Sequence, residues 1–195
     1  MLKFSFQKTR LLVTPLAAVL LFAAPPSESA PADNQAFLPL LDMTVARLHI
    51  ARQVALSKWD SRKPVEDLPR EADVIKAAAE EARALGVPTQ LATHFFADQI
   101  EANKLVQYGL LAQWHREGHA PDEKRVDLKK DIRPELDRLQ QGFIKQLADT
   151  KTLRAQADCS AQLARATQDY VTSHALDPLY AVAMDRALAR VCEQE

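Results

Sequence analysis

Residues 36–59 read AFLPLLDMTVARLHIARQVALSKW, and their apolar side chains recur near the spacing of one helix face. Leu41, Val45, Leu48 and Val54 carry this pattern, which predicts one long amphipathic helix ending around residues 59–62. The rest of the chain contains only four Gly and long runs of good helix formers. These features predict an all-α fold.

The segments that follow carry clear start and stop signals. After the turn KPVEDLP, Asp67 is expected to cap a second helix that runs to Gly86. Pro88 should open a third, long helix reaching about Trp114. A polar loop, REGHAPDEKR, then leads to three more helical segments that begin near Leu128. We expect one helix bundle over residues 33–195.

Both cysteines belong to the last two predicted helices, which form a hairpin. Asp177 is expected to cap the final helix, with Pro178 as its first residue. Cys159 and Cys192 lie at nearly equal distances on either side of that turn, so an antiparallel hairpin would bring them together. Such a disulfide would stabilise the fold by roughly 3 to 4 kcal/mol. The alternative is a pair of buried free thiols.

Residues 1–32 have the order of a cleavable secretory signal. A basic segment, MLKFSFQKTR, precedes an apolar run and then small residues, and residues 30–32 match the A-x-A cleavage pattern. A membrane anchor is the alternative, but Pro15 interrupts an apolar run shorter than the roughly 20 residues that span a bilayer. We expect a periplasmic or secreted protein, a location in which paired cysteines are usually oxidised.

Charge is balanced over the chain but concentrated locally. Lys and Arg number 25 and Asp and Glu 26, so nothing global points to nucleic acid or to an acidic membrane surface. Residues 57–73, SKWDSRKPVEDLPREAD, nevertheless contain nine charged side chains. A solvated loop is the simplest interpretation of this stretch. The alternative is that some of the charges surround a small anionic ligand.

Two further patterns favour a ligand site inside the bundle. Arg47 and Lys58 are eleven residues apart, almost three turns, so they share a helix face close to the apolar one. Asn103 and Gln107 are one turn apart in the third helix. For Arg47 and Lys58, the alternative is that their stems cover apolar surface while their charges reach water. For Asn103 and Gln107, it is that they are core amides with internal hydrogen-bond partners. A metal site is not expected, because only His115 and His119 have a suitable spacing and they straddle a loop glycine.

The stretches ARLHIARQVALSKW, KPVEDLPREADVI and THFFADQIEANKLVQYGLLAQW together resemble the all-helical AroQ-type chorismate mutases. The signal, the added C-terminal helices and the late cysteines make the chain similar to the exported, gamma-class branch. This resemblance implies a helical bundle that rearranges chorismate to prephenate without a cofactor, a step toward Phe and Tyr. It also implies a homodimer through the long helices.

The resemblance implies a role for each candidate residue. Arg47 binds a substrate carboxylate, and Lys58 and Gln107 share the ether oxygen. The remaining candidates are Asp67 and Glu71 near the substrate hydroxyl, Arg70 at the carboxylate end, Asn103 as a small polar contact, and Arg133 as the arginine that closes the site. Arg133 comes from the same chain in this branch, and Arg138 is the alternative if the register shifts.

Two departures and two rival functions accompany the resemblance. Val74 replaces a polar residue of some relatives, and Gln107 stands where some carry Glu, so we expect activity without a need for acidic pH. One rival function is an isochorismate pyruvate lyase on the same fold. The other is a non-catalytic periplasmic binding or adaptor protein whose charges form surface ion pairs.

Overall fold

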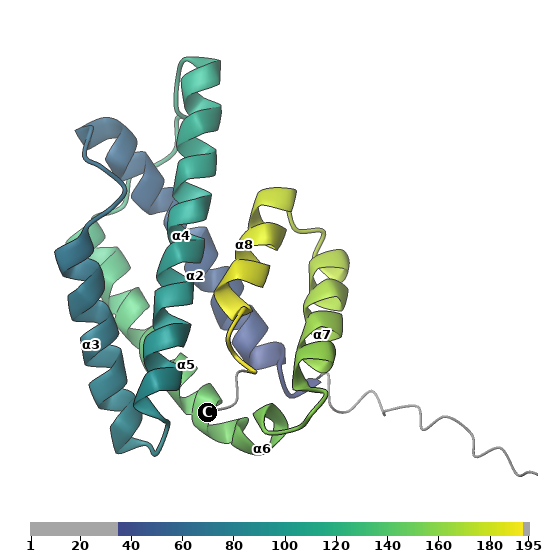
Figure 1. The fold of residues 1–195 in the computed structure, drawn as a ribbon. Coiled ribbons are helices and arrows are strands. Elements are labelled where there is room, and N and C mark those ends of the chain that lie inside the picture. Colours follow the sequence, from purple (N-terminus) through teal and green to yellow (C-terminus); the bar gives the residue numbers. More distant parts are fainter. Residues whose placement is uncertain (1–34, 193–195) are drawn as a thin grey trace, which may run out of the picture.

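The computed structural model describes residues 35–192, and these residues form a helical bundle (Figure 1). The helices are α2 (Leu38–Ser61), α3 (Leu68–Ala84), α4 (Thr89–Glu117), the short π-helix η1 (Leu128–Ile132), α5 (Arg133–Asp149), α6 (Lys151–Arg154), α7 (Cys159–Ser173) and α8 (Pro178–Leu188). The predicted signal segment lies outside the described residues. Within 35–192, no helix is both long and apolar enough to cross a bilayer.

The predicted all-α fold is confirmed, and most helix ends lie close to their expected positions. Helix α2 ends at Ser61, where Arg62 turns the chain with a φ of 58°. Asp67 caps α3 by accepting a hydrogen bond from the Arg70 amide, and Asp177 caps α8 by accepting one from the Leu179 amide. Each cap satisfies a backbone donor that the helix itself leaves unpaired.

The region after α4 contains more helical pieces than the sequence predicted. Three segments were expected, but η1 precedes α5 and the short α6 follows it. Asp127 produces η1 by accepting hydrogen bonds from the amides of Lys129 and Lys130 at 2.8 and 2.9 Å. At Thr150, which separates α5 from α6, the hydroxyl donates to the Gln146 carbonyl. Both features depend on local capping rather than on a long apolar pattern.

Helix α4 is the central element of the bundle. It packs against α2, α3 and α8, and its 29 residues span about 43 Å. Its apolar side chains meet those of α5 in an aromatic cluster of Phe95, Phe96 and Phe143, whose ring centroids lie 5.2 to 6.2 Å apart. Figure 1 shows α3 along one side of α4 and the α7–α8 pair along the other.

The C-terminal hairpin is closed by a disulfide and attached to the bundle by ion pairs. Cys159 and Cys192 form the predicted disulfide, with their Cα atoms 5.7 Å apart. Asp98 of α4, fully buried, pairs with Arg186 and Arg190 beyond the turn. Burial alone would raise the pKa of Asp98, but the hydrogen bonds from both arginines lower it. The hairpin is therefore a fixed part of the fold.

Candidate active site

A cavity of about 460 Å³ lies between α2, α3, α4 and the η1–α5 segment, which is within the size range of small-molecule sites. Its lining contains all eight residues predicted from the sequence: Arg47, Lys58, Asp67, Arg70, Glu71, Asn103, Gln107 and Arg133. Arg47 and Gln107 are buried, whereas Asp67, Arg70 and Arg133 are exposed. The cavity thus has a buried floor and an open side.

Arg47 places an uncompensated cation on the cavity floor. The residue is only 6% exposed, its Nε has no hydrogen-bond partner, and no ion pair to it is found among residues 35–192. Burial lowers the pKa of Arg47 to about 10, which still leaves it charged at neutral pH. A buried charge without a partner is costly, so this guanidinium is suited to bind an anion that enters the cavity.

The amide pair of α4 lies beside this guanidinium. Asn103 Nδ2 donates to the Arg47 carbonyl oxygen at 3.1 Å, and Gln107 Nε2 donates to Asn103 Oδ1 at 2.8 Å. The Gln107 Oε1 atom is buried without a partner. Because an amide nitrogen carries two N–H groups, Gln107 retains one donor in addition to that unused acceptor. This pair is incompletely satisfied, as expected of a site that receives a polar ligand.

The charged turn contributes a rigid corner to the cavity. Asp67 Oδ1 accepts from the Arg70 amide at 3.3 Å, and Glu71 Oε1 accepts from the Asp67 amide at 3.0 Å. These reciprocal bonds form a capping box that fixes the first turn of α3. The Asp67 and Glu71 carboxylates therefore stabilise the start of α3 and also belong to residues that line the cavity. Asp60, in the last turn of α2, does not line the cavity and pairs with Arg125 of the polar loop, which lowers the pKa of Asp60.

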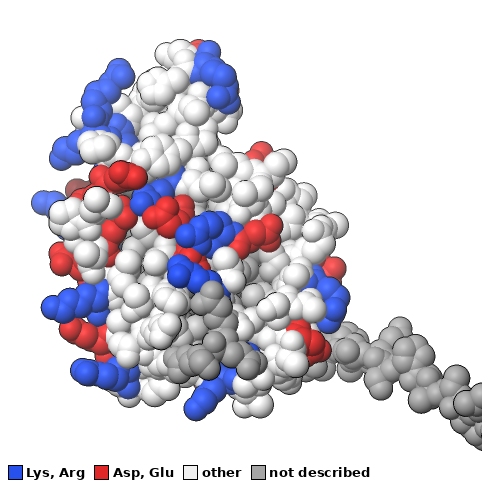
Figure 2. Space-filling view, in the orientation of Figure 1, with Lys and Arg blue, Asp and Glu red and all other residues white. Residues whose placement is uncertain are grey.

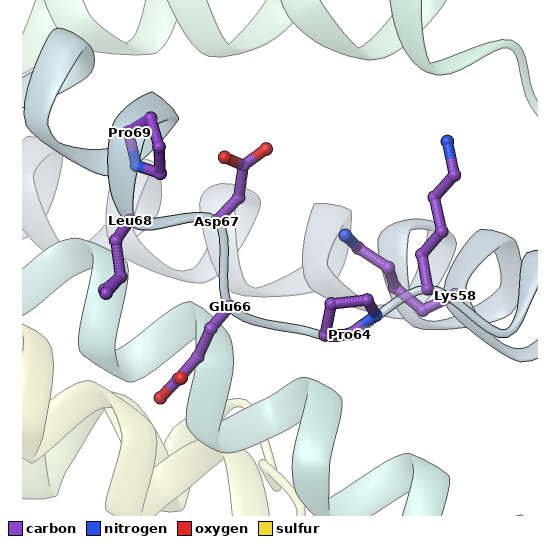
Figure 3. A pocket seen from close by; sticks show the side chains of 7 residues that line it. Lys58, Pro64, Glu66, Asp67, Leu68 and Pro69 are labelled. Atoms are coloured by element: carbon purple, nitrogen blue, oxygen red, sulfur yellow. The ribbon is translucent and has the colours of Figure 1, made fainter.

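A second hollow of about 510 Å³ lies against the outer side of the turn (Figure 3). It shares Lys58, Lys63 and Asp67 with the inner cavity. In Figure 3 the Lys58 ammonium and the Asp67 carboxylate extend to the same side of the chain, while Glu66 points the other way. The inner cavity is the better ligand site, because its polar groups converge from four elements. The outer hollow adjoins it at the shared residues.

Basic and acidic side chains both lie near the outer hollow. Figure 2 shows acidic and basic side chains interleaved over the face it draws, with basic ones gathered at the upper left, where Figure 1 draws the end of α2 and the following turn. Arg62 and Lys63 are exposed there. The protein thus combines a nearly neutral total charge with an inner cavity lined by seven Lys or Arg and three Asp or Glu side chains, an excess of positive charge that favours a small anion.

Arg133 reaches the cavity from the same chain, and Arg138 does not. Arg133 begins α5 and lines the cavity, whereas Arg138 lies one turn on, is exposed, and pairs with Glu135. The polar loop that leads to η1 is held to α2 by the Arg52–Glu123 and Asp60–Arg125 ion pairs. One chain therefore supplies Arg133 together with the other seven candidate residues of this cavity.

Several lining residues were missed by sequence reasoning. The additional polar groups are Ser57, Ser61, Lys63, Lys104, Lys129, Asp137 and Gln140. Lys104 is the most buried of the charged ones, at 8% exposure. It could have been found, because Ile100, Asn103, Lys104 and Gln107 follow the i, i+3, i+4, i+7 spacing of one helix face.

No metal centre accompanies these groups in the described part of the chain. Residues 35–192 contain no group of three or more His, Cys, Asp or Glu side chains arranged to hold a metal ion. His115 packs against the Trp59 ring instead, with centroids 4.7 Å apart. The cavity can bind a small molecule with acidic groups and stabilise negative charge that develops near Lys58 and Gln107.

Comparison with known proteins identifies the family to which the chain is similar. Residues 39–108 match the family described as chorismate mutase type II. The chain is 30% identical over 169 residues to a secreted chorismate mutase of Mycobacterium tuberculosis, covering 87% of this chain and 84% of the relative.

Two crystal structures show the same architecture over most of the chain. A chorismate mutase from Burkholderia phymatum is 45% identical, with a TM-score of 0.81 over 84% of this chain and 99% of the other. One from Burkholderia thailandensis is 39% identical, with a TM-score of 0.77 over 81% and 99%. The protein described here is therefore a member of the chorismate mutase family, of the all-helical AroQ type.

Proposed function

We propose that this protein catalyses the rearrangement of chorismate to prephenate. The observation that carries the proposal is the convergence of Arg47, Lys58 and Gln107 in one cavity, with the buried guanidinium and the amide oxygen both lacking internal partners. Chorismate is a small dianion with an ether oxygen between its ring and its enolpyruvyl arm. The cavity has cations for the carboxylates and donors for the ether oxygen.

The reaction is an intramolecular Claisen rearrangement, in which the ether C–O bond breaks while a C–C bond forms between the arm and the ring. All atoms of the substrate are retained, and no proton has to be transferred. The protein therefore has two tasks. It must hold the arm over the ring in a reactive pose, which can supply up to roughly 7 to 11 kcal/mol in the best intramolecular cases. It must also stabilise charge as the ether bond breaks.

Each of the eight residues named from the sequence has a proposed part in these tasks. Arg47 and Arg133 orient the two carboxylates, because guanidinium groups bind carboxylates in a bidentate manner. Lys58 and the free Gln107 N–H meet the ether oxygen, which becomes more negative in the transition state. Arg70 supports the carboxylate end, Asp67 and Glu71 receive the substrate hydroxyl, and Asn103 orients Gln107 through the hydrogen bond at 2.8 Å.

Export and dimerisation complete the proposal. The disulfide and the secreted relative from Mycobacterium tuberculosis support export through a cleaved signal. Prephenate made outside the cytoplasm would enter the route to Phe and Tyr only if a further exported enzyme consumes it or if it is imported into the cell. The homodimer rests on the family resemblance alone, and light scattering after size-exclusion chromatography measures it directly.

The test follows chorismate consumption by its ultraviolet absorbance and identifies the products by chromatography. We expect the purified protein to form prephenate, and Lys58→Ala to lower kcat by about 10²- to 10³-fold because a transition-state donor is lost. Lys76→Ala, which removes an exposed lysine of α3 outside the cavity, is the matched control and should keep full activity. If the protein forms no prephenate from chorismate but releases pyruvate from isochorismate, its activity is that of a lyase and not that of a mutase.

A further inference from the structure

Lys104 is a charged residue of the cavity wall that the proposed mechanism does not use. It belongs to α4, between Asn103 and Gln107, and its side chain is only 10% exposed. Its Nζ lies 3.1 Å from Glu71 Oε2 and 2.6 Å from Glu101 Oε1. A lysine at this depth requires partners, and both of its partners are carboxylates.

The two carboxylates lie in different surroundings. Glu101 is one turn back on the same helix, is exposed, and is not part of the cavity lining. Glu71 belongs to α3, lines the cavity, and is more deeply placed, with a side-chain exposure of 17%. The contact with Glu71 is thus the one that joins two walls of the site. The contact with Glu101 anchors the lysine from outside.

Glu71 is held at both of its oxygens. Oε1 accepts from the Asp67 amide within the capping box, and Oε2 accepts from Lys104. A carboxylate bound in this way has one fixed orientation, while each oxygen keeps a further lone pair for a ligand. Burial alone would lower the pKa of Lys104, but the bonds to Glu101 and Glu71 raise it, so the ammonium remains charged at neutral pH.

We infer that Lys104 is a positioning residue that holds the Glu71 carboxylate in the orientation that recognises the hydroxyl of the substrate ring. The inference rests on the proposed function. Lys104 acts through Glu71, and it links the first turn of α3 to the part of α4 that carries Asn103 and Gln107. Its removal would leave Glu71 held at Oε1 alone, free to rotate away from the ligand.

The test compares Lys104→Met, which keeps the stem of the side chain but not its charge, with the conservative Lys104→Arg. We expect Lys104→Met to raise KM for chorismate about tenfold or more with a smaller change in kcat, because a hydrogen bond to a charged group that binds the substrate is weakened. Lys104→Arg should recover most of this loss. Glu101→Gln is the matched control, since it removes the outer partner only, and should leave KM within about twofold.

A double-mutant cycle distinguishes positioning from a merely structural role. If Lys104 acts through Glu71, then Glu71→Gln should add little to the KM of Lys104→Met, although it raises KM in the wild-type chain. Thermal unfolding of each variant reports whether it is folded, and Lys104→Gln replaces Lys104→Met in the cycle if the latter does not fold.

The outcomes separate this inference from the proposed function. A wild-type KM for Lys104→Met, or effects of the two substitutions that simply multiply, would overturn the role of Lys104 while leaving the mutase activity in place. A wild-type protein that does not convert chorismate would overturn the proposed function and this inference with it.

Discussion

Two buried charges on opposite sides of the bundle, Asp98 of α4 and Arg47 of α2, differ in whether they have a partner. Toward α8, Asp98 is fully buried and is paired with both Arg186 and Arg190. Arg47 is almost as deeply buried, but its Nε has no partner and its pKa is lowered to about 10. Burial alone therefore does not separate structural from functional residues here. For these two charges the difference is the partner: Asp98 is paired within the fold, whereas the Arg47 side chain lines the cavity without an ion pair among residues 35–192.

Two glutamines of α4 lie on different sides of the helix. Gln99 Nε2 faces the hairpin and donates to the Ala187 carbonyl at 3.3 Å, which ties α4 to α8. Gln107 faces the cavity, where its Nε2 donates to Asn103. Both glutamines leave a buried side-chain oxygen without a partner, but only the oxygen of Gln107 belongs to a residue that lines the cavity and is available to a ligand.

The largest expected effect on stability is at Asp98, the buried charge that is paired within the fold. Asp98→Asn should lower the free energy of unfolding by about 2 to 3 kcal/mol, since it leaves two arginines without their carboxylate but able to reach water. Urea denaturation measures this change. Because Asp98 does not line the cavity, kcat of the folded protein should stay within about twofold of wild type. A large loss of kcat at unchanged stability would break the contrast.

The next effect concerns the arginine that closes the cavity. Arg133→Ala should raise KM for chorismate about 10- to 100-fold, because one carboxylate loses its charged partner. Arg138→Ala is the matched control, since Arg138 is exposed and pairs only with Glu135, one turn away. Steady-state kinetics of both variants decide between the two positions. If Arg138→Ala raises KM and Arg133→Ala does not, Arg138 is the arginine that closes the cavity.

Acid should lower the free energy of unfolding, because it protonates Asp98 and removes the charge that pairs with the two arginines. The pKa of Asp98 is lowered below 3.8 in the folded chain, so the unfolded chain binds this proton more readily. The stabilisation by Asp98 is therefore complete above the pKa of the unfolded chain, and it is lost as the pH falls through the lower pKa of the folded chain. The stability difference between wild type and Asp98→Asn should shrink over the same range, and a constant difference would contradict the assignment.

The smallest expected effect is the dependence of turnover on pH. Gln107 donates a hydrogen bond without first taking up a proton, and Arg47, with a pKa of about 10, remains charged. We therefore expect kcat/KM to vary by less than about threefold between mildly acidic and neutral pH. A pH–rate profile with a sharp fall toward neutrality would show that a protonated acid, rather than the amide, meets the ether oxygen.

Much of the fold followed from local signals. The caps at Asp67 and Asp177 were predicted because a short polar side chain precedes a proline-led helix start. The disulfide was predicted because the two cysteines flank the hairpin turn symmetrically. The extra pieces η1 and α6 were not predicted, since the capping by Asp127 and the break at Thr150 leave no apolar period to detect.

The candidate site was predictable in its members but not in its connections. The eight residues named from the sequence all line one cavity, and their roles remain proposals. It did not reveal that Val54, expected in the apolar core, lines the cavity instead, or that Lys104 joins α4 to Glu71. Such contacts depend on how two helices rotate against each other, which the period of one helix does not specify.

The most direct test of the central claim is Arg47→Met, measured for chorismate turnover and for unfolding in urea. Methionine retains the apolar stem and removes a buried charge that has no internal partner. We predict a loss of about 100-fold or more in kcat/KM, together with an unfolding free energy equal to or above that of wild type. Near-normal turnover, or a clear loss of stability, would show that Arg47 serves the fold rather than the substrate.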